Sequence, residues 1–141
     1  MGSKVFRRTL SIATRGSSFV PVTEPVAAVV AGSTIREGLC NVFIRHTSAS
    51  VLITENADPA VHRDLERFMQ RIAPEDAGYE HDAEGPDDMP AHLRSMLTAV
   101  TLTIPVSAGE LLLGTWQGIY LWEHRSRPHP RELLVTVLGE A

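Results

Sequence analysis

The chain has a single cysteine, Cys40, among its 141 residues. One cysteine excludes an intrachain disulfide and a zinc site built from several thiolates. Cys40 lies beside an apolar strand pattern, so we expect it to be an inert residue of the core. The sequence also lacks any apolar run of about 18 residues, the length that a membrane-spanning helix needs. We therefore expect a cytoplasmic protein without a membrane partner.

Positive charge is not in excess either. The formal net charge is −4 at pH 7, from 13 Lys and Arg against 17 Asp and Glu. Domains that bind nucleic acids usually present a basic face, so this balance argues against a nucleic-acid partner. Hydrophobic residues make up 43% of the chain, which argues against disorder. The length suits one domain over residues 1–141.

Hydrophobic patterns divide the chain into many strands and a few helices. Alternating or continuous apolar runs predict strands over residues 5–14, 39–45, 51–54, 100–106, 111–113, 119–122 and 133–138. One short helix is expected from Thr23, as its cap, to Gly32, and a longer one from the cap Asp58 to Ile72. A third helix is expected to contain His92. The predicted class is α+β: a compact single domain of mostly antiparallel β-sheets with a few helices packed on them.

The most unusual stretch runs from His81 to His92 and contains four carboxylates and two imidazoles. Asp88 lies four residues before His92, a spacing that one helical turn brings together. Asp87 and Asp88 are candidate helix caps, with Pro90 in the first turn, so the first turn should present His92. Carboxylates and imidazoles bind divalent cations, and a helix start binds anions, so a phosphorylated substrate would suit this stretch. The alternative is a solvated acidic loop with two incidental histidines.

Two further polar segments lie next to expected strands. Residues 46–50, His-Thr-Ser-Ala-Ser, lie between two apolar runs and offer donors to an anion, or form an ordinary Ser/Thr turn. Residues 114–118, Gly-Thr-Trp-Gln-Gly, suggest a bulge or a close backbone approach. The loop from Arg125 to Arg131 is basic and rich in proline, and its arginines could supply donors to a phosphate.

Together these segments resemble the YjbQ family, also called UPF0047. The resemblance rests on residues 46–49, 55–58, 85–92 and 114–119, with Glu123 close behind, and it covers roughly the whole chain. Some members of this family are described as secondary thiamine-phosphate synthases. The resemblance implies a β-rich α+β fold, a homotrimer and a site between subunits. It also implies an activity: joining a pyrimidine pyrophosphate to a thiazole phosphate, with release of pyrophosphate.

The residues that match the family pattern are His46, Glu55, Asn56, Asp88, His92, Thr115, Gln117 and Glu123. From the resemblance and from their chemistry, we expect catalytic roles for His46, His92 and Glu123. We expect Asp88, His92 and Glu123 to bind a divalent metal. Carboxylates alone would favour Mg²⁺, and added imidazole would favour Zn²⁺ or another transition ion. Contacts to a small phosphorylated metabolite are expected from Thr47, Ser48, Asn56, Thr115, Gln117 and Arg125.

Two other classes of function stay open on the sequence. The same ligands would suit a metal-dependent hydrolase of a phosphorylated metabolite. A non-catalytic ligand-binding protein would use the same residues without turnover. Pyrophosphate release marks the synthase, hydrolysis marks the second class, and binding without product marks the third.

Overall fold

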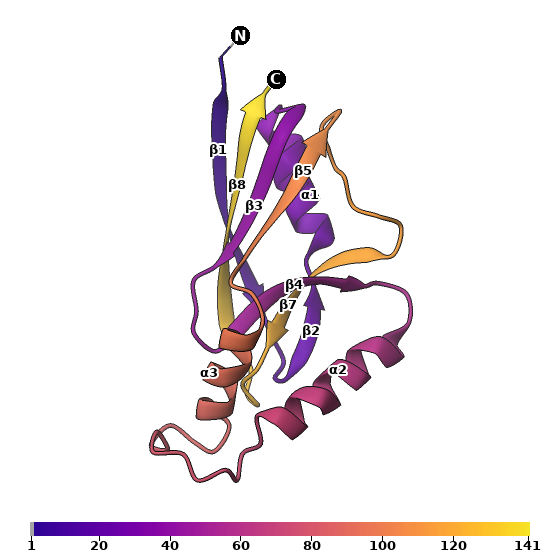
Figure 1. Cartoon of the computed structure of the whole chain (residues 1–141). Helices are drawn as coiled ribbons and strands as arrows, with labels where there is room; N and C mark the ends of the chain where they lie inside the picture. The colour runs from indigo at the N-terminus through magenta and orange to yellow at the C-terminus, as the bar shows by residue number, and fades with distance from the viewer. Residues whose placement is uncertain (1) are drawn as a thin grey trace.

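A computed structural model describes residues 2–141, and over this range it contains eight strands and three helices (Figure 1). Five strands form one antiparallel sheet in the order β1-β8-β3-β5-β6, and three form a second in the order β2-β7-β4. The strands are β1 (Lys4–Ala13), β2 (Ser18–Pro21), β3 (Glu37–Ile44), β4 (Ala49–Glu55), β5 (Thr101–Ser107), β6 (Glu110–Leu111), β7 (Gln117–Glu123) and β8 (Pro130–Glu140). The helices are α1 (Thr23–Ser33), α2 (Pro59–Ile72) and α3 (Asp88–Leu97). The predicted α+β class is confirmed.

The core lies between the larger sheet, the smaller sheet and α1. Strand β8 pairs with both β1 and β3, and its register places Val135 opposite Val42 and Val137 opposite Cys40. These four side chains are fully buried on the face that α1 covers, as the alternation of the strands predicts. Over the described residues, no helix covers the opposite face of this sheet (Figure 1).

Helix α1 starts at Thr23 as expected, but without the expected side-chain cap, and it ends one residue later than Gly32. The Thr23 hydroxyl does not cap the helix: it accepts a hydrogen bond from the backbone N–H of Ile119 in β7, at 2.8 Å. Gly32 lies inside the helix, where glycine costs stability without stopping the chain. The helix ends at Ser33 because Thr34 takes a left-handed conformation, with φ of 61°.

Two of the strand expectations need correction. Strand β2 was not expected, because it has only four residues and follows the turn at Gly16 directly. The return strand expected over residues 111–113 is the two-residue β6 instead. Ala108 and Gly109 both have positive φ, which makes the tight turn into β6, and the chain leaves the sheet after Leu111. The other expected strands are present, with shifted ends.

Helix α2 confirms the predicted start, because the Asp58 side chain accepts a hydrogen bond from the N–H of Ala60 at 2.9 Å. The apolar stripe of α2 is less buried than expected. Met69 is buried, but Phe68 and Ile72 are 47% and 45% exposed. The far end of α2 leads into a loop that lies opposite the two termini and connects to α3 (Figure 1). None of the helices over residues 2–141 is long and apolar enough to cross a membrane.

Candidate metal and anion site

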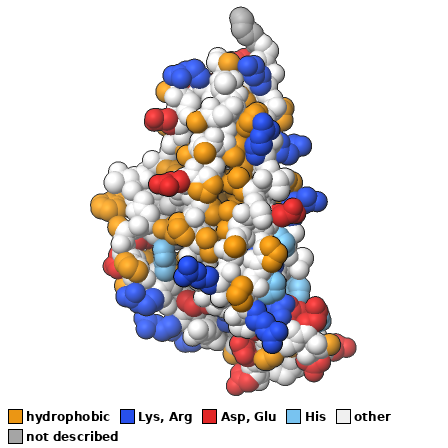
Figure 2. Space-filling view, turned by 180° about the vertical axis from the view of Figure 1, so that it is seen from behind, with side chains coloured by type: hydrophobic (Ala, Val, Ile, Leu, Met, Phe, Trp, Pro, Cys, Tyr) orange, Lys and Arg blue, Asp and Glu red, His pale blue; other side chains and the backbone are white. Residues whose placement is uncertain are grey.

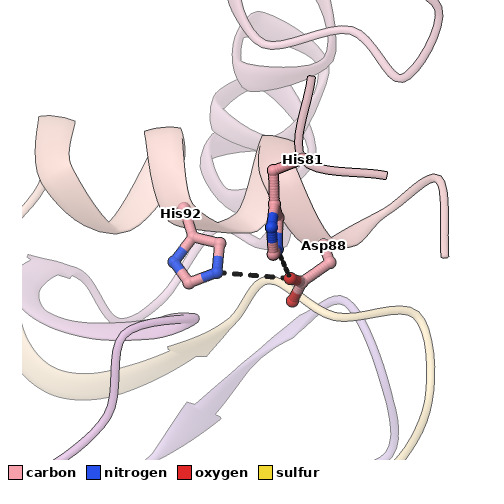
Figure 3. A group of neighbouring side chains, drawn as sticks. All are labelled: His81, Asp88 and His92. Atoms are coloured by element: carbon pink, nitrogen blue, oxygen red, sulfur yellow. Dashed lines mark hydrogen bonds and ion pairs between the residues drawn. The ribbon is translucent and has the colours of Figure 1, made fainter. Parts of the chain in front are cut away.

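Three side chains converge at the start of α3 (Figure 3). The Asp88 carboxylate oxygen Oδ2 lies 2.6 Å from His81 Nε2 and 3.2 Å from His92 Nε2. One nitrogen or oxygen from each of the three residues lies within 4.8 Å of the other two. Asp88 is buried, and His92 is about one-third exposed. We call this group the His81–Asp88–His92 triad.

Local sequence explains most of this arrangement. Asp88 and His92 share one face of α3 because they lie four residues apart. His92 belongs to the second turn and not to the first, because the helix begins only at Asp88. His81 reaches the pair from the preceding loop, which Gly85 bends with a φ of 103°. His81 was not among the ligands expected from the sequence, although it lies in the same acidic stretch.

Arg125 holds the carboxylates of this site in place. Its Nε donates to Asp87 Oδ2 at 2.9 Å, and its Nη2 donates to the carbonyl of Glu84 at 2.9 Å. Its Nη1 forms an ion pair with Asp88 Oδ1 at 2.9 Å. Asp87 does not cap α3 with its side chain, because that carboxylate also accepts from Ser126. The guanidinium of Arg125 thus closes the acidic loop onto the end of β7.

The ionisation of the site follows from these contacts. Burial alone would raise the pKa of Asp87, but the hydrogen bonds from Arg125 and Ser126 outweigh it and lower this pKa to about 2. Burial would likewise raise the pKa of Asp88, but the hydrogen bond from His81 and the charge of Arg125 hold it below its usual value. The same hydrogen bond to Asp88 raises the pKa of His81. Asp88 is therefore an ionised carboxylate between two imidazoles at neutral pH.

A pocket of about 650 Å³ opens beside Arg125. Its lining includes the acidic residues Glu75, Glu84 and Asp87, and a basic wall formed by Arg125, Arg127 and His129. Acidic and basic side chains gather at this lower end of the molecule (Figure 2). The volume suits a small molecule, and the basic wall suits an anionic group on it.

Glu123 lies in a second polar network and not in the triad. It is fully buried, and its oxygens accept from Thr14 Oγ1 at 2.7 Å, from the backbone N–H of Arg125 at 3.1 Å and from Arg131. Burial would raise the pKa of Glu123, but the Arg131 and Thr14 hydrogen bonds hold it below its usual value. Arg125 connects this network to the triad.

His46 and Ser48 belong to the same second network. Arg131 Nη2 donates to Ser48 Oγ at 3.0 Å, and Arg131 Nη1 lies 3.4 Å from His46 Nδ1. His46 Nε2 accepts from the backbone N–H of Glu132 at 2.9 Å. The neighbouring Thr47 is exposed. This loop packs beside α3, where Ser95 Oγ donates to the carbonyl of Ala49.

The remaining expected site residues lie at the other end of the smaller sheet. Asn56 Nδ2 donates to the carbonyls of Thr115 and Gln117, at 3.1 and 3.4 Å, and Gln117 Oε1 accepts from Gly114 N at 2.8 Å. Glu55 accepts from the backbone at the start of α2. β7 has seven residues, so about 20 Å separate this loop from Glu123 within one chain.

The structure thus brings Asp88 and His92 together, adds His81, and groups Glu123 with His46 and Ser48. Asn56, Thr115 and Gln117 form a third group. Two imidazoles and one carboxylate whose ligand atoms lie within 4.8 Å of one another can hold a transition-metal ion, and the buried Asp88 would supply the anionic ligand.

Comparisons with known proteins give one consistent result. A family model described as "UPF0047 protein YjbQ-like" matches residues 8–140. A UPF0047 protein of Synechocystis sp. is 54% identical over 93% of this chain and 90% of its own length. The UPF0047 protein YjbQ of Salmonella typhimurium is 41% identical over 96% of this chain and 99% of its own length. A YbjQ-like protein of unknown function from Sulfolobus solfataricus, solved by crystallography, superposes with a TM-score of 0.91 at 26% identity, covering 99% of this chain and 100% of the other.

Proposed function

This chain belongs to the UPF0047 family of YjbQ-like proteins, and from that premise we propose that it is a metal-assisted enzyme acting on a small phosphorylated metabolite. The observation that carries the proposal is the His81–Asp88–His92 triad with Arg125 against its carboxylate. Imidazole ligands favour Zn²⁺ or another transition ion over Mg²⁺, which prefers oxygen. The specific reaction that we propose is the one implied by the resemblance: a pyrimidine pyrophosphate joined to a thiazole phosphate.

The residues of the site would have separate roles in this reaction. A divalent cation, when bound, would offset the negative charge that develops on the oxygens of the departing pyrophosphate. Asp88 fixes both imidazoles in one orientation, and the hydrogen bond from His81 and the charge of Arg125 keep Asp88 ionised. The basic wall of the adjoining pocket, from Arg127 and His129, would bind the phosphate oxygens. Arg125 itself contributes less to substrate binding than to holding the acidic loop in place, because its guanidinium already contacts Asp87, Asp88 and Glu84.

We also propose that the complete site needs a second copy of the chain. Val5, Leu39, Phe43 and Leu138 share the sheet face that no described helix covers, and they are between 40% and 63% exposed. Further copies would cover this apolar face, and a closed ring of three is the arrangement that the resemblance implies. Such a ring could bring the loop with Trp116, which is 64% exposed, from one copy to the triad of another.

An activity assay with matched variants tests the reaction. The protein is incubated with the pyrimidine pyrophosphate and the thiazole phosphate, with Zn²⁺, with Mg²⁺ or with chelator, and thiamine phosphate and pyrophosphate are measured. We expect product with a metal and none with chelator. Asp88→Asn should lose more than the roughly 10–100-fold that removing a residue behind the ligands costs. Asp64→Asn, an exposed carboxylate on α2, is the matched control and should retain activity.

Two results would replace this proposal with another. Release of phosphate or pyrophosphate without a joined product would favour a hydrolase. Binding of either substrate without any product, under all metal conditions, would favour a non-catalytic ligand-binding protein.

A further inference from the structure

The ring of His46 has a hydrogen-bond donor on each side. Its Nε2 lies 2.9 Å from the backbone nitrogen of Glu132, and its Nδ1 lies 3.4 Å from Nη1 of Arg131. A backbone N–H and a guanidinium can only donate, and a neutral imidazole has only one nitrogen that accepts. At one of the two contacts, therefore, two donors face each other.

The distances show which contact is the hydrogen bond. The shorter one, to Glu132, makes Nε2 the acceptor and leaves the proton on Nδ1, which faces Arg131. Burial and the charge of Arg131 lower the pKa of His46, so the ring is neutral at pH 7. The charges around the ring are those of Arg131, Glu132, Glu123 and Arg45.

The other donors of Arg131 already have acceptors. Its Nε binds Glu123 Oε1 at 2.8 Å, and its Nη2 binds Glu123 Oε2 and Ser48 Oγ. Arg131 is only 4% exposed, so a donor left without an acceptor there is costly. Nη1 is thus a nearly buried donor whose neighbour is another donor. His46 is half-buried and the adjoining Thr47 is exposed, so this point lies close to the surface.

We propose that His46 Nδ1–H and Arg131 Nη1–H together bind one oxygen of a phosphate group. An oxyanion is the partner that satisfies two neighbouring donors, one of them charged. The Thr47 hydroxyl lies next in sequence and can donate to a second oxygen. This phosphate subsite is separate from the triad and is connected to it through Glu123, which accepts from both Arg131 and the backbone of Arg125. It rests on the proposed function in one respect: it would hold the phosphate of that substrate.

Nuclear magnetic resonance of the His46 ring tests the subsite directly. The probe is inorganic phosphate, added to chelator-treated protein so that no metal contributes. We expect the ring to carry its proton on Nδ1, and we expect phosphate to shift the ring resonances of His46 and the Nε resonance of Arg131. His46→Phe should weaken phosphate binding about tenfold or more, because it removes a donor at a charged site.

The matched control is Arg45→Gln. Arg45 is exposed beside the same loop and lies 3.9 Å from Glu132, so its loss lowers the local positive charge and leaves the proposed donors in place. We expect its phosphate affinity to change by about twofold at most. Equal losses in Arg45→Gln and His46→Phe would overturn the subsite in favour of diffuse electrostatic attraction. A proton on Nε2, or ring resonances that millimolar phosphate does not shift, would also overturn it.

The two proposals can fail separately. Phosphate binding at His46 in a protein that binds no metal and forms no product would support the subsite and refute the proposed function. Metal-dependent product formation by a protein whose His46 ring does not respond to phosphate would do the reverse.

Discussion

His124 should make the protein lose stability in mild acid. Its side chain is 1% exposed, and its Nε2 lies 2.8 Å from Ser50 Oγ. Burial, helped by the charge of Arg94, lowers the pKa of His124 from 6.5 to about 3. The ring is therefore neutral in the folded protein and becomes protonated in the unfolded chain as the pH falls below 6.5. The stability it contributes is complete above pH 6.5 and is lost progressively between pH 6.5 and about pH 3.

The magnitude follows from that shift. Each pH unit within the window costs about 1.4 kcal/mol, so moving from pH 7 to pH 5 should lower the free energy of unfolding by about 2 kcal/mol through this residue. Urea denaturation at both pH values measures the loss. His124→Gln keeps a group that can bond to Ser50 but cannot titrate, so its loss over the same interval should be smaller by about 2 kcal/mol.

Other histidines change the stability of the wild type and of the variant equally, so the difference between the two proteins isolates the contribution of His124. The lowered pKa of His46 acts in the same direction, and the raised pKa of His81 acts in the opposite one. Equal losses in both proteins would refute the reasoning. So would a titration of the folded wild type in which the His124 ring protonates near pH 6.5, a measurement that does not depend on the variant folding.

Three further outcomes are expected from the fold. Glu123→Ala leaves the buried Arg131 without its carboxylate and should lower the free energy of unfolding in urea by about 3–5 kcal/mol. Glu132→Ala removes an exposed carboxylate and is the control, and an equally small loss in both variants would refute a stabilising role for the buried pair. Asp58→Ala removes the α2 cap and should cost about 1 kcal/mol in the same assay, so unchanged stability would show that the cap contributes nothing. Light scattering should detect an oligomer for the wild type and a smaller species for Phe43→Asp; a wild-type monomer would remove the proposed ring.

The parts of the site that sequence could predict are the local ones. Asp88 and His92 could be paired because a helical turn fixes neighbours four residues apart, and Asp58 could be recognised as a cap from the proline that follows it. Cys40 could be expected in the core because it lies beside an apolar strand pattern, and it is fully buried. Each of these inferences needed only a few adjacent residues.

The parts that sequence could not predict depend on contacts between distant segments. Arg125 and Asp87 form a hydrogen bond although they lie 38 residues apart in the sequence, and no periodicity predicts that contact. His81 joins the triad only because its loop folds back onto α3. Glu123 looked like a metal ligand, but the packing of the two sheets places it beside Arg131, and four donors already surround its carboxylate. The metal role expected for Glu123 thus stays a prediction, with its oxygens already bonded within the chain.

The proposed reaction requires a metal ion at the triad, and the metal content of the purified protein shows whether one is bound. The protein is purified without affinity-tag metals, analysed for bound ions, and then titrated with Zn²⁺ after treatment with chelator. We predict one ion per chain for the wild type and for His62→Gln, whose ring stacks on Phe19 away from the triad, and none for Asp88→Asn. Zn²⁺ affinity should also fall as the pH drops through the raised pKa of His81, because protons compete for that nitrogen. A wild type without stoichiometric metal, or an Asp88→Asn variant that binds Zn²⁺ as the wild type does, would contradict the account.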